Sequence, residues 1–464
     1  MKRRNFCATF AAGVAAPLPQ ARKPNLLIVL ADDMGYGDVG CYGSPDVPTP
    51  HIDQLARNGV RFTDGYVSCA VCSPSRVALL TGRYQHRLGH EFNSGPPARE
   101  SEVNFGLPRE AKILPDFVKP AGYRTGVIGK WHLGVRPGYH PLDRGFDEFF
   151  GFLTGGNAFV TTRTPGAVNV ATTDGNGRIP ETRDAPIYRN REIVAEDRYL
   201  TDAFAEEAAA FIQSNRSQPF ALYLAFNAIH TPLHATAKYV DRVAAIANPK
   251  HRQLAAMTVA LDDAIGSVLA ALNQAGLDRD TLVVFLSDNG CPTMTGAGTN
   301  YPLNGEKVTY FEGGIRVPFI MRWPGRIPGG KVYSHPVVSR DILPTFLSAA
   351  GIGSGVQFDG VDLMPHVQGQ STSVPHEVLF WRGGKGRAVR KGKWKLVEFG
   401  DSFSALYDLS KDIGEKNDLS RTYPDVVREL RQAWRAWSNQ MKPPAWPPRF
   451  RDVTVNETKL TWEL

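Results

Sequence analysis

Two uninterrupted apolar runs, each followed directly by acidic or amide side chains, constrain the fold of this chain more than any other feature. Residues 25–31 (NLLIVLA) precede Asp32 and Asp33, and residues 281–287 (TLVVFLS) precede Asp288 and Asn289. Apolar runs of this length are typical of parallel strands buried on both faces of a sheet. They predict a sheet with polar groups at its carboxyl edge.

Two further apolar runs and three helical patterns extend this interpretation. Residues 220–226 (FALYLAF) are followed by His230, and residues 126–129 (GVIG) are followed by Lys130 and His132. Between the runs, apolar residues recur at helical spacing over residues 49–58, 201–214 and 251–275. Alternating strands and helices predict an α/β fold with a mostly parallel sheet. Ligands of such sheets bind at the carboxyl ends of the strands, where these polar side chains should converge.

The chain has 464 residues, more than a single hydrophobic core usually serves, so a large domain and a smaller partner are expected. We predict a catalytic domain over residues 22–369 and a smaller domain over residues 370–464. The second region shows short strand patterns, one helical pattern and a proline-rich tail. An antiparallel sheet with a helix is therefore expected there, from strands at 377–381, 387–397 and 405–409 and a helix near 424–441.

Residues 1–21 have the features of an export signal, with a basic start followed by a short stretch of small apolar residues. Arg3 and Arg4 are consistent with a twin-arginine signal, and a disordered basic tail is the alternative interpretation. No run of 18 or more apolar residues follows, so we predict no membrane span. The expected location is outside the cytoplasm, either periplasmic or secreted.

The net charge of +7 favours polyanionic partners, which include nucleic acids and sulfated glycans alike. The basic stretch 382–395 could guide a polyanion, but a solvated strand face is the simpler interpretation. Only Trp381 and Trp394 flank this stretch, whereas nucleic-acid binding favours interleaved aromatic side chains. We therefore predict no nucleic-acid partner.

Residues 72–76 (CSPSR), followed by residues 80–83 (LTGR), carry the most specific motif of the chain. An isolated Cys72 would be interpreted as a buried structural thiol. The segment resembles the type I sulfatase signature C-x-P-S-R-x-x-x-L-T-G at every specified position. The resemblance implies a large mixed, mostly parallel sheet sandwiched by helices, like that of alkaline phosphatase. It also implies that a maturation enzyme oxidises Cys72 to formylglycine, whose hydrated aldehyde attacks sulfur.

Asp32, Asp33, Asp288 and Asn289 form a set of hard oxygen ligands that suits Ca²⁺ or Mg²⁺. The resemblance assigns them, together with Cys72, as metal ligands and favours Ca²⁺ over Mg²⁺. A second acidic pair, Asp262 and Asp263, falls inside a helical pattern and is expected to be solvated or to support the helix.

Cleavage of a sulfate ester requires cations around the sulfate, an acid for the departing alcohol and a base for the nucleophile. The resemblance assigns sulfate binding to Lys130 and Lys307 and deprotonation of the hydrated aldehyde to His132. It makes His230 the acid for the leaving group, in contact with the substrate. Arg76 is then expected to hold the oxygen of residue 72 and the metal ligands.

Near Lys307 the chain departs from the family pattern, because Asn304 stands where arginine is frequent and Val308 stands where glycine is frequent. These departures affect the expected substrate wall rather than the class of enzyme. The sequence predicts hydrolysis of sulfate monoesters, with a sulfated carbohydrate as substrate and small aryl sulfates as artificial substrates. A hydrolase of phosphonates or phosphate diesters is one alternative, and a sulfated-glycan binding protein that has lost catalysis is another.

Overall fold

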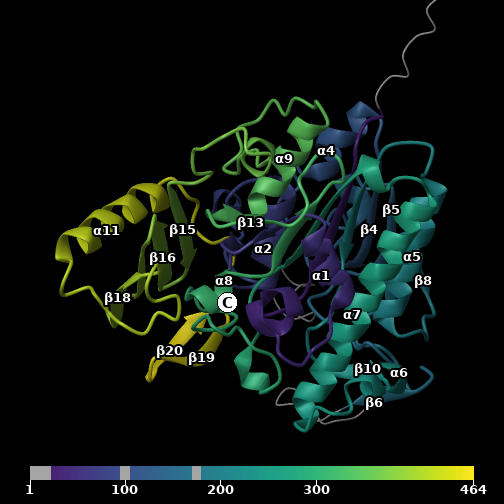
Figure 1. Ribbon diagram of the computed structural model, residues 1–464, viewed down its shortest axis with the longest axis horizontal. Coiled ribbons are helices and arrows are strands. Elements are labelled where there is room, and N and C mark those ends of the chain that lie inside the picture. Colours follow the sequence, from purple (N-terminus) through teal and green to yellow (C-terminus); the bar gives the residue numbers. More distant parts are fainter. Residues whose placement is uncertain (1–21, 95–104, 170–178) are drawn as a thin grey trace, which may run out of the picture.

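The computed structural model describes residues 22–94, 105–169 and 179–464. The predicted export signal, residues 1–21, lies outside the described residues. In Figure 1 a large α/β body carries a smaller part, which contains α11 and β15–β20, on one side.

A mixed sheet of ten strands forms the centre of the body, in the order β13-β2-β12-β11-β1-β9-β4-β5-β7-β8. Neighbours from β11 to β5 are parallel, as are β13 and β2, whereas β12, β7 and β8 are antiparallel to their neighbours. The predicted large mixed, mostly parallel sheet is confirmed. The bounds are β1 Asn25–Ala31, β2 Val60–Phe62, β4 Arg124–Lys130, β5 Glu148–Phe152, β7 Ile187–Arg189, β8 Glu192–Val194, β9 Phe220–Ala225, β11 Thr281–Ser287, β12 Phe319–Arg322 and β13 Lys331–Tyr333.

Helices cover both faces of the sheet, because successive side chains of each central strand point to opposite sides. Leu27 and Val29 of β1 contribute to the core beneath one set of helices, and Leu26 and Ile28 contribute to the core beneath the other. Figure 1 shows α5 and α7 along one side of the sheet. The first set is α1 (Pro50–Arg57), α5 (Leu200–Ser214) and α7 (Pro249–Gln274), and the second is α2 (Cys72–Thr81), α4 (Leu114–Val118) and α9 (Ile342–Ala349).

Helix α7 is long and apolar enough to cross a membrane, judged by length and composition alone. However, 72% of its most apolar window is buried inside the fold, where it lies against α5 and α1. A helix that is apolar and buried in this way is typical of the core of a globular protein.

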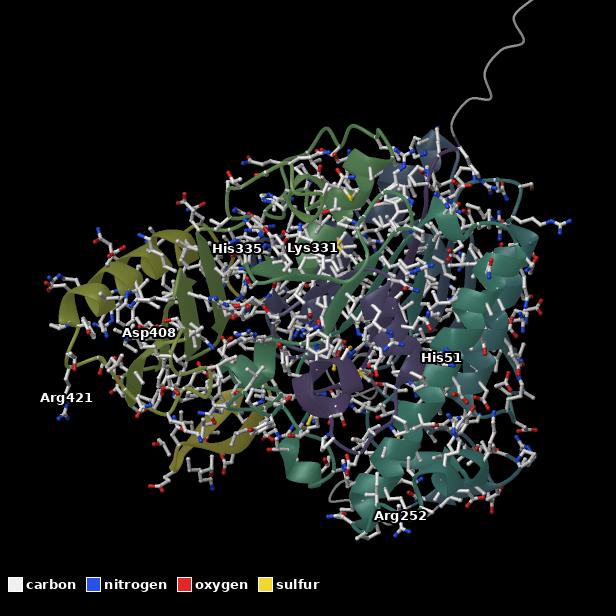
Figure 2. The ribbon with its side chains drawn as sticks, in the orientation of Figure 1. His51, Arg252, Lys331, His335, Asp408 and Arg421 are labelled. Carbon is white, nitrogen blue, oxygen red and sulfur yellow. The ribbon has the colours of Figure 1, made fainter. Side chains whose placement is uncertain are left out.

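Asp262 of α7 corrects the expectation that the acidic pair in this helix is solvated or supports its own helix. The side chain is fully buried, and its two oxygens accept hydrogen bonds from the backbone N–H groups of His51 (3.1 Å) and Ile52 (2.8 Å). Figure 2 labels His51 near this contact between α1 and α7. Asp262 thus satisfies free donors at the first turn of α1, while Asp263 remains partly exposed and pairs with Arg242.

The C-terminal part contains the predicted antiparallel sheet, but with four strands rather than three, in the order β15-β16-β17-β18. The single strand predicted over 387–397 is wrong, because a turn at Gly392 divides it into a hairpin. A second hairpin, formed by β19 and β20, follows the proline-rich tail. The sequence patterns did not predict it. The bounds are β15 Val378–Gly383, β16 Gly386–Lys391, β17 Trp394–Phe399, β18 Phe403–Asp408, α11 Pro424–Ser438, β19 Phe450–Val455 and β20 Thr458–Glu463.

The basic stretch 382–395 is a solvated strand face only in part: Lys385, Lys391 and Lys393 are exposed, but two other cations are not. Arg390 and Lys395 are opposite each other in the β16–β17 register, and both are buried. Arg390 pairs with Asp64, and Lys395 pairs with Glu312. The hairpin turn explains the difference, since it brings these two side chains to one face, where they meet carboxylates of the large α/β body.

A shared core joins the C-terminal sheet to the large α/β body. Trp381 of β15 packs against Tyr66 and donates a hydrogen bond from Nε1 to the carbonyl of Val67 at 2.8 Å. The remaining short elements are β3 (Gly65–Tyr66) paired with β14 (Val337–Val338), β6 (Ala167–Asn169) paired with β10 (His234–Thr236), and helices α6 (Ala237–Val240), α8 (Glu312–Ile315) and α10 (Met364–Val367).

Candidate active site

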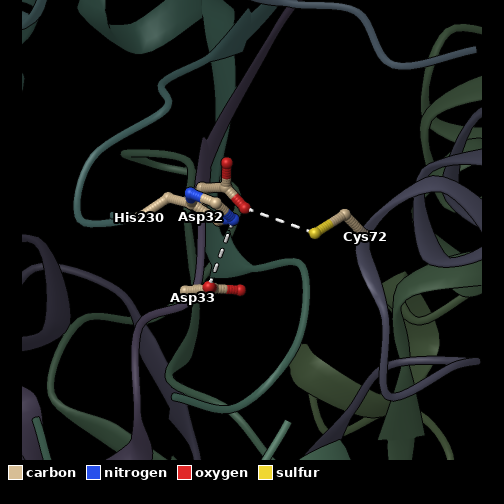
Figure 3. A group of neighbouring side chains, drawn as sticks. All are labelled: Asp32, Asp33, Cys72 and His230. Carbon is tan, nitrogen blue, oxygen red and sulfur yellow. Dashed lines mark hydrogen bonds and ion pairs between the residues drawn. The ribbon is translucent and has the colours of Figure 1, made fainter. Parts of the chain in front are cut away.

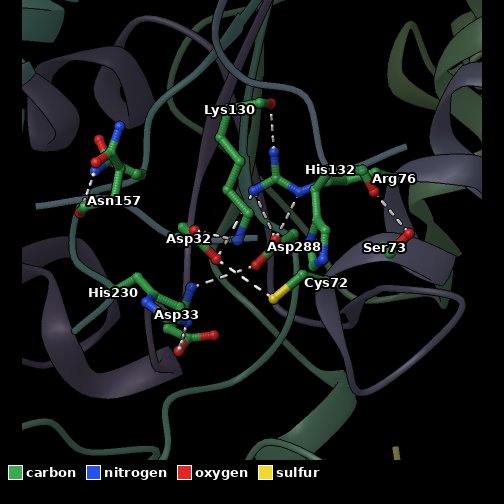
Figure 4. Close-up of polar contacts among 12 residues, drawn as sticks. Asp32, Asp33, Cys72, Ser73, Arg76, Lys130, His132, Asn157, His230 and Asp288 are labelled. Atoms are coloured by element: carbon green, nitrogen blue, oxygen red, sulfur yellow. Dashed lines mark hydrogen bonds and ion pairs between the residues drawn. The ribbon is translucent and has the colours of Figure 1, made fainter. Parts of the chain in front are cut away.

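The predicted site residues meet at the carboxyl edge of four adjacent strands. Asp32 and Asp33 follow β1, Asp288 follows β11, Lys130 ends β4, and His230 follows β9. These four strands are parallel neighbours, and in the pairing register their ends differ by at most one residue. Figure 4 shows their polar side chains pointing toward a common centre. Sheet topology therefore brings together residues that are up to 256 positions apart in sequence.

Cys72 is the first residue of α2, and its side chain points from the helix into this cluster. The Sγ atom lies 3.6 Å from Asp32 Oδ1 and is buried. The N-terminus of a helix carries partial positive charge, which favours an anion at this position. Burial raises the pKa of the Cys72 thiol to about 12, so an unmodified Cys72 is protonated at neutral pH and a poor nucleophile.

Four side chains offer ligand atoms that all lie within 4.8 Å of one another: Asp32, Asp33, Cys72 and His230. Figure 3 shows this group. Asn289 donates from Nδ2 to Asp33 Oδ1 at 2.7 Å, while its own Oδ1 is buried and has no hydrogen-bond partner among the described residues. Clustered carboxylates with an unsatisfied amide oxygen fit a hard divalent cation. His230 belongs to this group by distance, although the sequence pattern did not include it among the metal ligands.

Asp288 lies beside this group and is bound by Arg76. The guanidinium of Arg76 donates to Asp288 Oδ2 from Nε (3.0 Å) and Nη2 (2.7 Å), and to the carbonyl of Lys130 at 2.9 Å. Burial and the neighbouring charge of Asp32 raise the pKa of Asp288 to about 6, although Arg76 opposes that shift. The carboxylates are therefore close enough to repel one another, a repulsion that a bound cation would relieve.

Each of the other two carboxylates is paired with a buried lysine. Lys130 Nζ lies 2.6 Å from Asp32 Oδ2, and Lys307 Nζ lies 2.7 Å from Asp33 Oδ1. Burial alone would raise the pKa of Asp32, but the charge of Lys130 and its cationic neighbours outweighs burial and holds that pKa well below its usual range. The site thus contains fixed charges of both signs within one cluster.

The described side chains of the cluster differ in how far they are exposed to solvent. Lys130 and Arg76 are fully buried, whereas the side chains of His230 and Lys307 are 21% and 10% exposed. His230 Nδ1 contacts the carbonyl of Thr231 at 2.6 Å, and Nε2 lies 3.6 Å from Asp33 Oδ2. Among these four residues, His230 and Lys307 therefore lie nearest to solvent.

His132 follows β4 in a left-handed backbone conformation, with φ of 57°. Residues other than glycine rarely adopt this conformation, and such strain is often found at functional sites. The backbone N–H of His132 donates to the carbonyl of Leu153 at 3.0 Å. Burial, followed by the charges of Lys130 and Arg76, lowers the pKa of the imidazole well below its usual value. Both causes disfavour the protonated ring, so the imidazole is neutral.

Gly155 provides the space that the His132 ring occupies. A β-carbon at Gly155 would lie 2.6 Å from His132 Nε2, too close for any contact of this type, whereas one at Gly156 would lie 3.8 Å from His230 Cε1. We expect Gly155→Ala to displace the His132 ring and lower kcat by about 10-fold to 100-fold, because small misplacements of catalytic groups are costly. Steady-state kinetics on an aryl sulfate would measure this change. Gly156→Ala is the matched control, and equal losses in both variants would contradict the steric argument.

The two departures from the family pattern, Val308 and Asn304, differ in their surroundings. Val308 has φ of 87°, a conformation that glycine adopts far more readily, and it immediately follows Lys307. Asn304 donates from Nδ2 to Asn456 Oδ1 at 2.8 Å and to the carbonyl of Glu415 at 3.3 Å. It therefore contacts the C-terminal part, which no local pattern indicated.

A nucleophile position at a helix N-terminus, opposite clustered carboxylates, two lysines and two histidines, is characteristic of α/β enzymes that hydrolyse anionic esters. A family model described as Sulfatase matches residues 24–352, and one described as N-sulphoglucosamine sulphohydrolase, C-terminal, matches residues 305–440. The chain belongs to the sulfatase family and is a sulfuric ester hydrolase.

Relatives and solved structures agree with this assignment. N-acetylgalactosamine-6-sulfatase of Canis lupus familiaris is 36% identical over 413 residues, which cover 83% of this chain and 73% of that protein. Arylsulfatase A of Homo sapiens is 34% identical, with coverage of 92% and 90%. A crystal structure of Ps i-CgsB in complex with k-i-k-neocarrahexaose superimposes with a TM-score of 0.82 at 35% identity, covering 92% of this chain and 95% of that one.

Proposed function

We propose that this sulfatase removes sulfate from a sulfated carbohydrate, with a formylglycine nucleophile formed from Cys72 by a maturation enzyme. The observation that carries the proposal is the placement of Cys72 at the N-terminus of α2, against Asp32 and near the charges of two buried lysines, Lys130 and Lys307. The carbohydrate is supported by the names of the N-acetylgalactosamine-6-sulfatase relative and of the neocarrahexaose complex. The net charge of +7 also favours a polyanionic substrate.

A divalent cation, Ca²⁺ or alternatively Mg²⁺, fits the oxygen ligands of the site. We infer that Asp32, Asp33, Asp288 and Asn289 hold it together with the oxygen of the modified residue 72. When bound, the cation would withdraw electron density from the sulfate oxygens and from the hydroxyl of residue 72. In this cluster Lys130 contacts Asp32, and Lys307 contacts Asp33. The carboxylates would bind the cation, and the lysines would bind the sulfate.

Formylglycine would supply, as the hydrated aldehyde, one hydroxyl that attacks sulfur and a second whose deprotonation expels sulfate and restores the aldehyde. Lys130 and Lys307 would bind the sulfate oxygens, and Arg76 would fix the orientation of residue 72 and Asp288. His230 would give a proton to the alcohol oxygen when its bond to sulfur breaks. His132, neutral because of burial, would accept the proton from residue 72.

His230→Ala should lower kcat most for substrates with poor leaving groups. An alcohol of high pKa needs protonation as the bond to sulfur breaks, whereas a nitrophenolate leaves without help. We expect a loss of about 10²-fold to 10⁴-fold for a poor leaving group and a much smaller loss for nitrophenyl sulfate. A series of aryl sulfates that differ in leaving-group pKa measures the dependence. Equal losses across the series would argue against the acid role.

The proposed substrate and nucleophile are tested together by mass spectrometry of the Cys72 peptide and by turnover assays. Paired aryl sulfate and aryl phosphonate esters would separate a sulfatase from a phosphonate hydrolase that uses the same nucleophile. Sulfated galactose-based oligosaccharides, compared with the aryl sulfate, would test the carbohydrate. Formylglycine with sulfate release from an oligosaccharide is the expected result, and an unmodified Cys72 in protein that still turns over would contradict the proposed nucleophile.

We also propose that the enzyme is exported to the periplasm or secreted. A polymeric sulfated carbohydrate is too large to enter a cell intact, and the basic, small-apolar composition of residues 1–21 supports export. Fractionation of the native host, with detection of the protein outside the cytoplasm, is the corresponding measurement.

A further inference from the structure

The hydroxyl of Ser73 connects the first turn of α2 to the backbone of His132. Ser73 Oγ donates to the carbonyl of His132 at 2.7 Å. His90 Nε2 lies 2.6 Å from Ser73 Oγ. Figure 4 shows the contact between Ser73 and His132. The one hydroxyl hydrogen is directed to the carbonyl, so His90 must be the donor in the second bond. Burial lowers the pKa of His90 to about 3, although a contact with the backbone of Gly106 opposes that shift, so the ring is neutral.

The proline-rich tail of the chain reaches the other side of His90. The indole of Trp446 meets the imidazole edge to face, with ring centroids 4.6 Å apart. Trp446 Nε1 donates to the carbonyl of Asn93 at 3.1 Å, and Asn93 Oδ1 accepts the backbone N–H of Ser73 at 2.9 Å. Trp446 therefore supports Ser73 by two routes, one through His90 and the other through Asn93.

Backbone hydrogen bonds fix the tail in this position. Lys442 N–H donates to the carbonyl of His86 at 3.1 Å, and Ala445 N–H donates to the carbonyl of Gly89 at 2.8 Å. The indole of Trp446 also packs against Phe92 and Phe105. The tail is thus attached to the loop that carries His90 rather than merely lying on the surface.

We propose that Ser73, His90 and Trp446 are positioning residues that hold His132 in its left-handed conformation beside residue 72. The inference rests on the proposed function, in which His132 accepts a proton from that residue. The backbone of His132 is fixed at both ends, by Leu153 at its N–H and by Ser73 at its carbonyl. Loss of the second contact would release a strained residue and let the imidazole rotate away.

The first variants remove one link at a time. His90→Phe keeps a ring against Trp446 but removes the donor, Ser73→Ala removes the hydroxyl, and His90→Gln retains an N–H donor at a similar distance. Rates on an aryl sulfate are divided by the formylglycine content that mass spectrometry gives. We expect His90→Phe and Ser73→Ala to lower kcat by about 10-fold to 100-fold with KM within about twofold. His90→Gln should recover much of the loss.

The double variant distinguishes a chain of contacts from two independent effects. Because Ser73 and His90 act in series, Ser73→Ala with His90→Phe should lose no more than the worse single variant. Multiplied losses, or equal changes in kcat and KM, would overturn the proposal.

Trp446→Phe tests the contribution of the tail, and Trp437→Phe is its matched control. Both indoles are 6% exposed, but Trp437 packs against Tyr84 and His86 rather than His90. We expect kcat to fall by about threefold to tenfold in Trp446→Phe, because one of the two routes to Ser73 is removed, and to stay unchanged in Trp437→Phe. Equal effects in the two variants would overturn the role of the tail.

A readout without turnover separates this inference from the proposed function. The imidazole resonances of His132, assigned with a His132→Asn variant, should shift in His90→Phe and remain in place in Trp437→Phe. A wild-type enzyme without sulfate release would count against the proposed function, and the imidazole spectrum would still decide whether His90 positions His132. An unchanged His132 spectrum in His90→Phe would overturn the inference.

Discussion

Replacement of Cys72 by alanine is expected to lower sulfate release by at least about 10⁴-fold, since removal of a covalent nucleophile leaves only binding and charge stabilisation. The fold should survive, because the Cys72 side chain makes one weak contact at 3.6 Å with Asp32. Loss of a small buried side chain should cost about 1 kcal/mol of unfolding free energy. Turnover of an aryl sulfate and thermal unfolding would measure the two effects separately.

Two companion variants make this result specific. Cys69 is also buried, three residues earlier, and lies 3.7 Å from the hydroxyl of Tyr310 instead of facing the carboxylates, so Cys69→Ala should retain activity. Cys72→Ser offers one hydroxyl but lacks the second that expels sulfate. It should therefore release at most one equivalent of aryl alcohol and then stop. Continuous turnover in either Cys72 variant would refute the formylglycine mechanism.

Lys395→Met is expected to reduce the unfolding free energy by about 3–5 kcal/mol, because it leaves buried carboxylates without their cation. Lys395 Nζ lies 2.8 Å from Glu312 Oε1 and 2.8 Å from Glu415 Oε1, and all three side chains are fully buried. Glu312 also accepts from Tyr66 and pairs with Arg316. The group joins the C-terminal sheet to the catalytic part. Urea unfolding followed by tryptophan fluorescence would measure the change.

Lys393→Met is the matched control for this loss. Lys393 pairs with Asp408 at 2.9 Å, but its side chain is 49% exposed, so its replacement should cost at most about 1 kcal/mol. Similar losses of unfolding free energy in the two variants would show that the buried ion pairs of Lys395 stabilise the fold no more than an exposed ion pair does.

The loss in Lys395→Met should also depend on pH. Burial already raises the pKa of Glu415 from 4.5 to about 7. A carboxyl with a raised folded-state pKa contributes stability below pH 4.5, and that contribution is lost as pH rises toward 7. Without Lys395 the pKa should rise further, so the deficit relative to wild type should be larger at pH 8 than at pH 5.5. A deficit that is independent of pH would contradict this explanation.

The tail of the chain changes how the C-terminal part is understood. The sequence predicts a smaller domain with a proline-rich tail and gives that tail no role at the site. Trp446 instead supports Ser73 and His90, and Asn304 meets the final hairpin at Asn456. Variants in the C-terminal part can therefore alter catalysis without touching the substrate.

The sequence by itself determined the α/β class and which residues face the site. Continuous apolar runs of this length are typical of strands buried on both faces of a sheet. Residues 25–31 and 281–287 match β1 and β11 residue for residue. Their carboxyl ends place Asp32 and Asp288 at one edge, because parallel neighbours end together.

Tertiary structure alone decided the contacts that depend on distant partners. Asp262, Arg390 and Lys395 appear in the sequence as ordinary charged positions, yet each is buried, since a partner far along the chain satisfies its charge or its hydrogen bonds. His90 gave no spacing signal, because its link to Ser73 requires the chain to reverse after α2. Local periodicity reports which side chains avoid water, whereas the pairing of buried polar groups depends on contacts between segments that only the folded chain brings together.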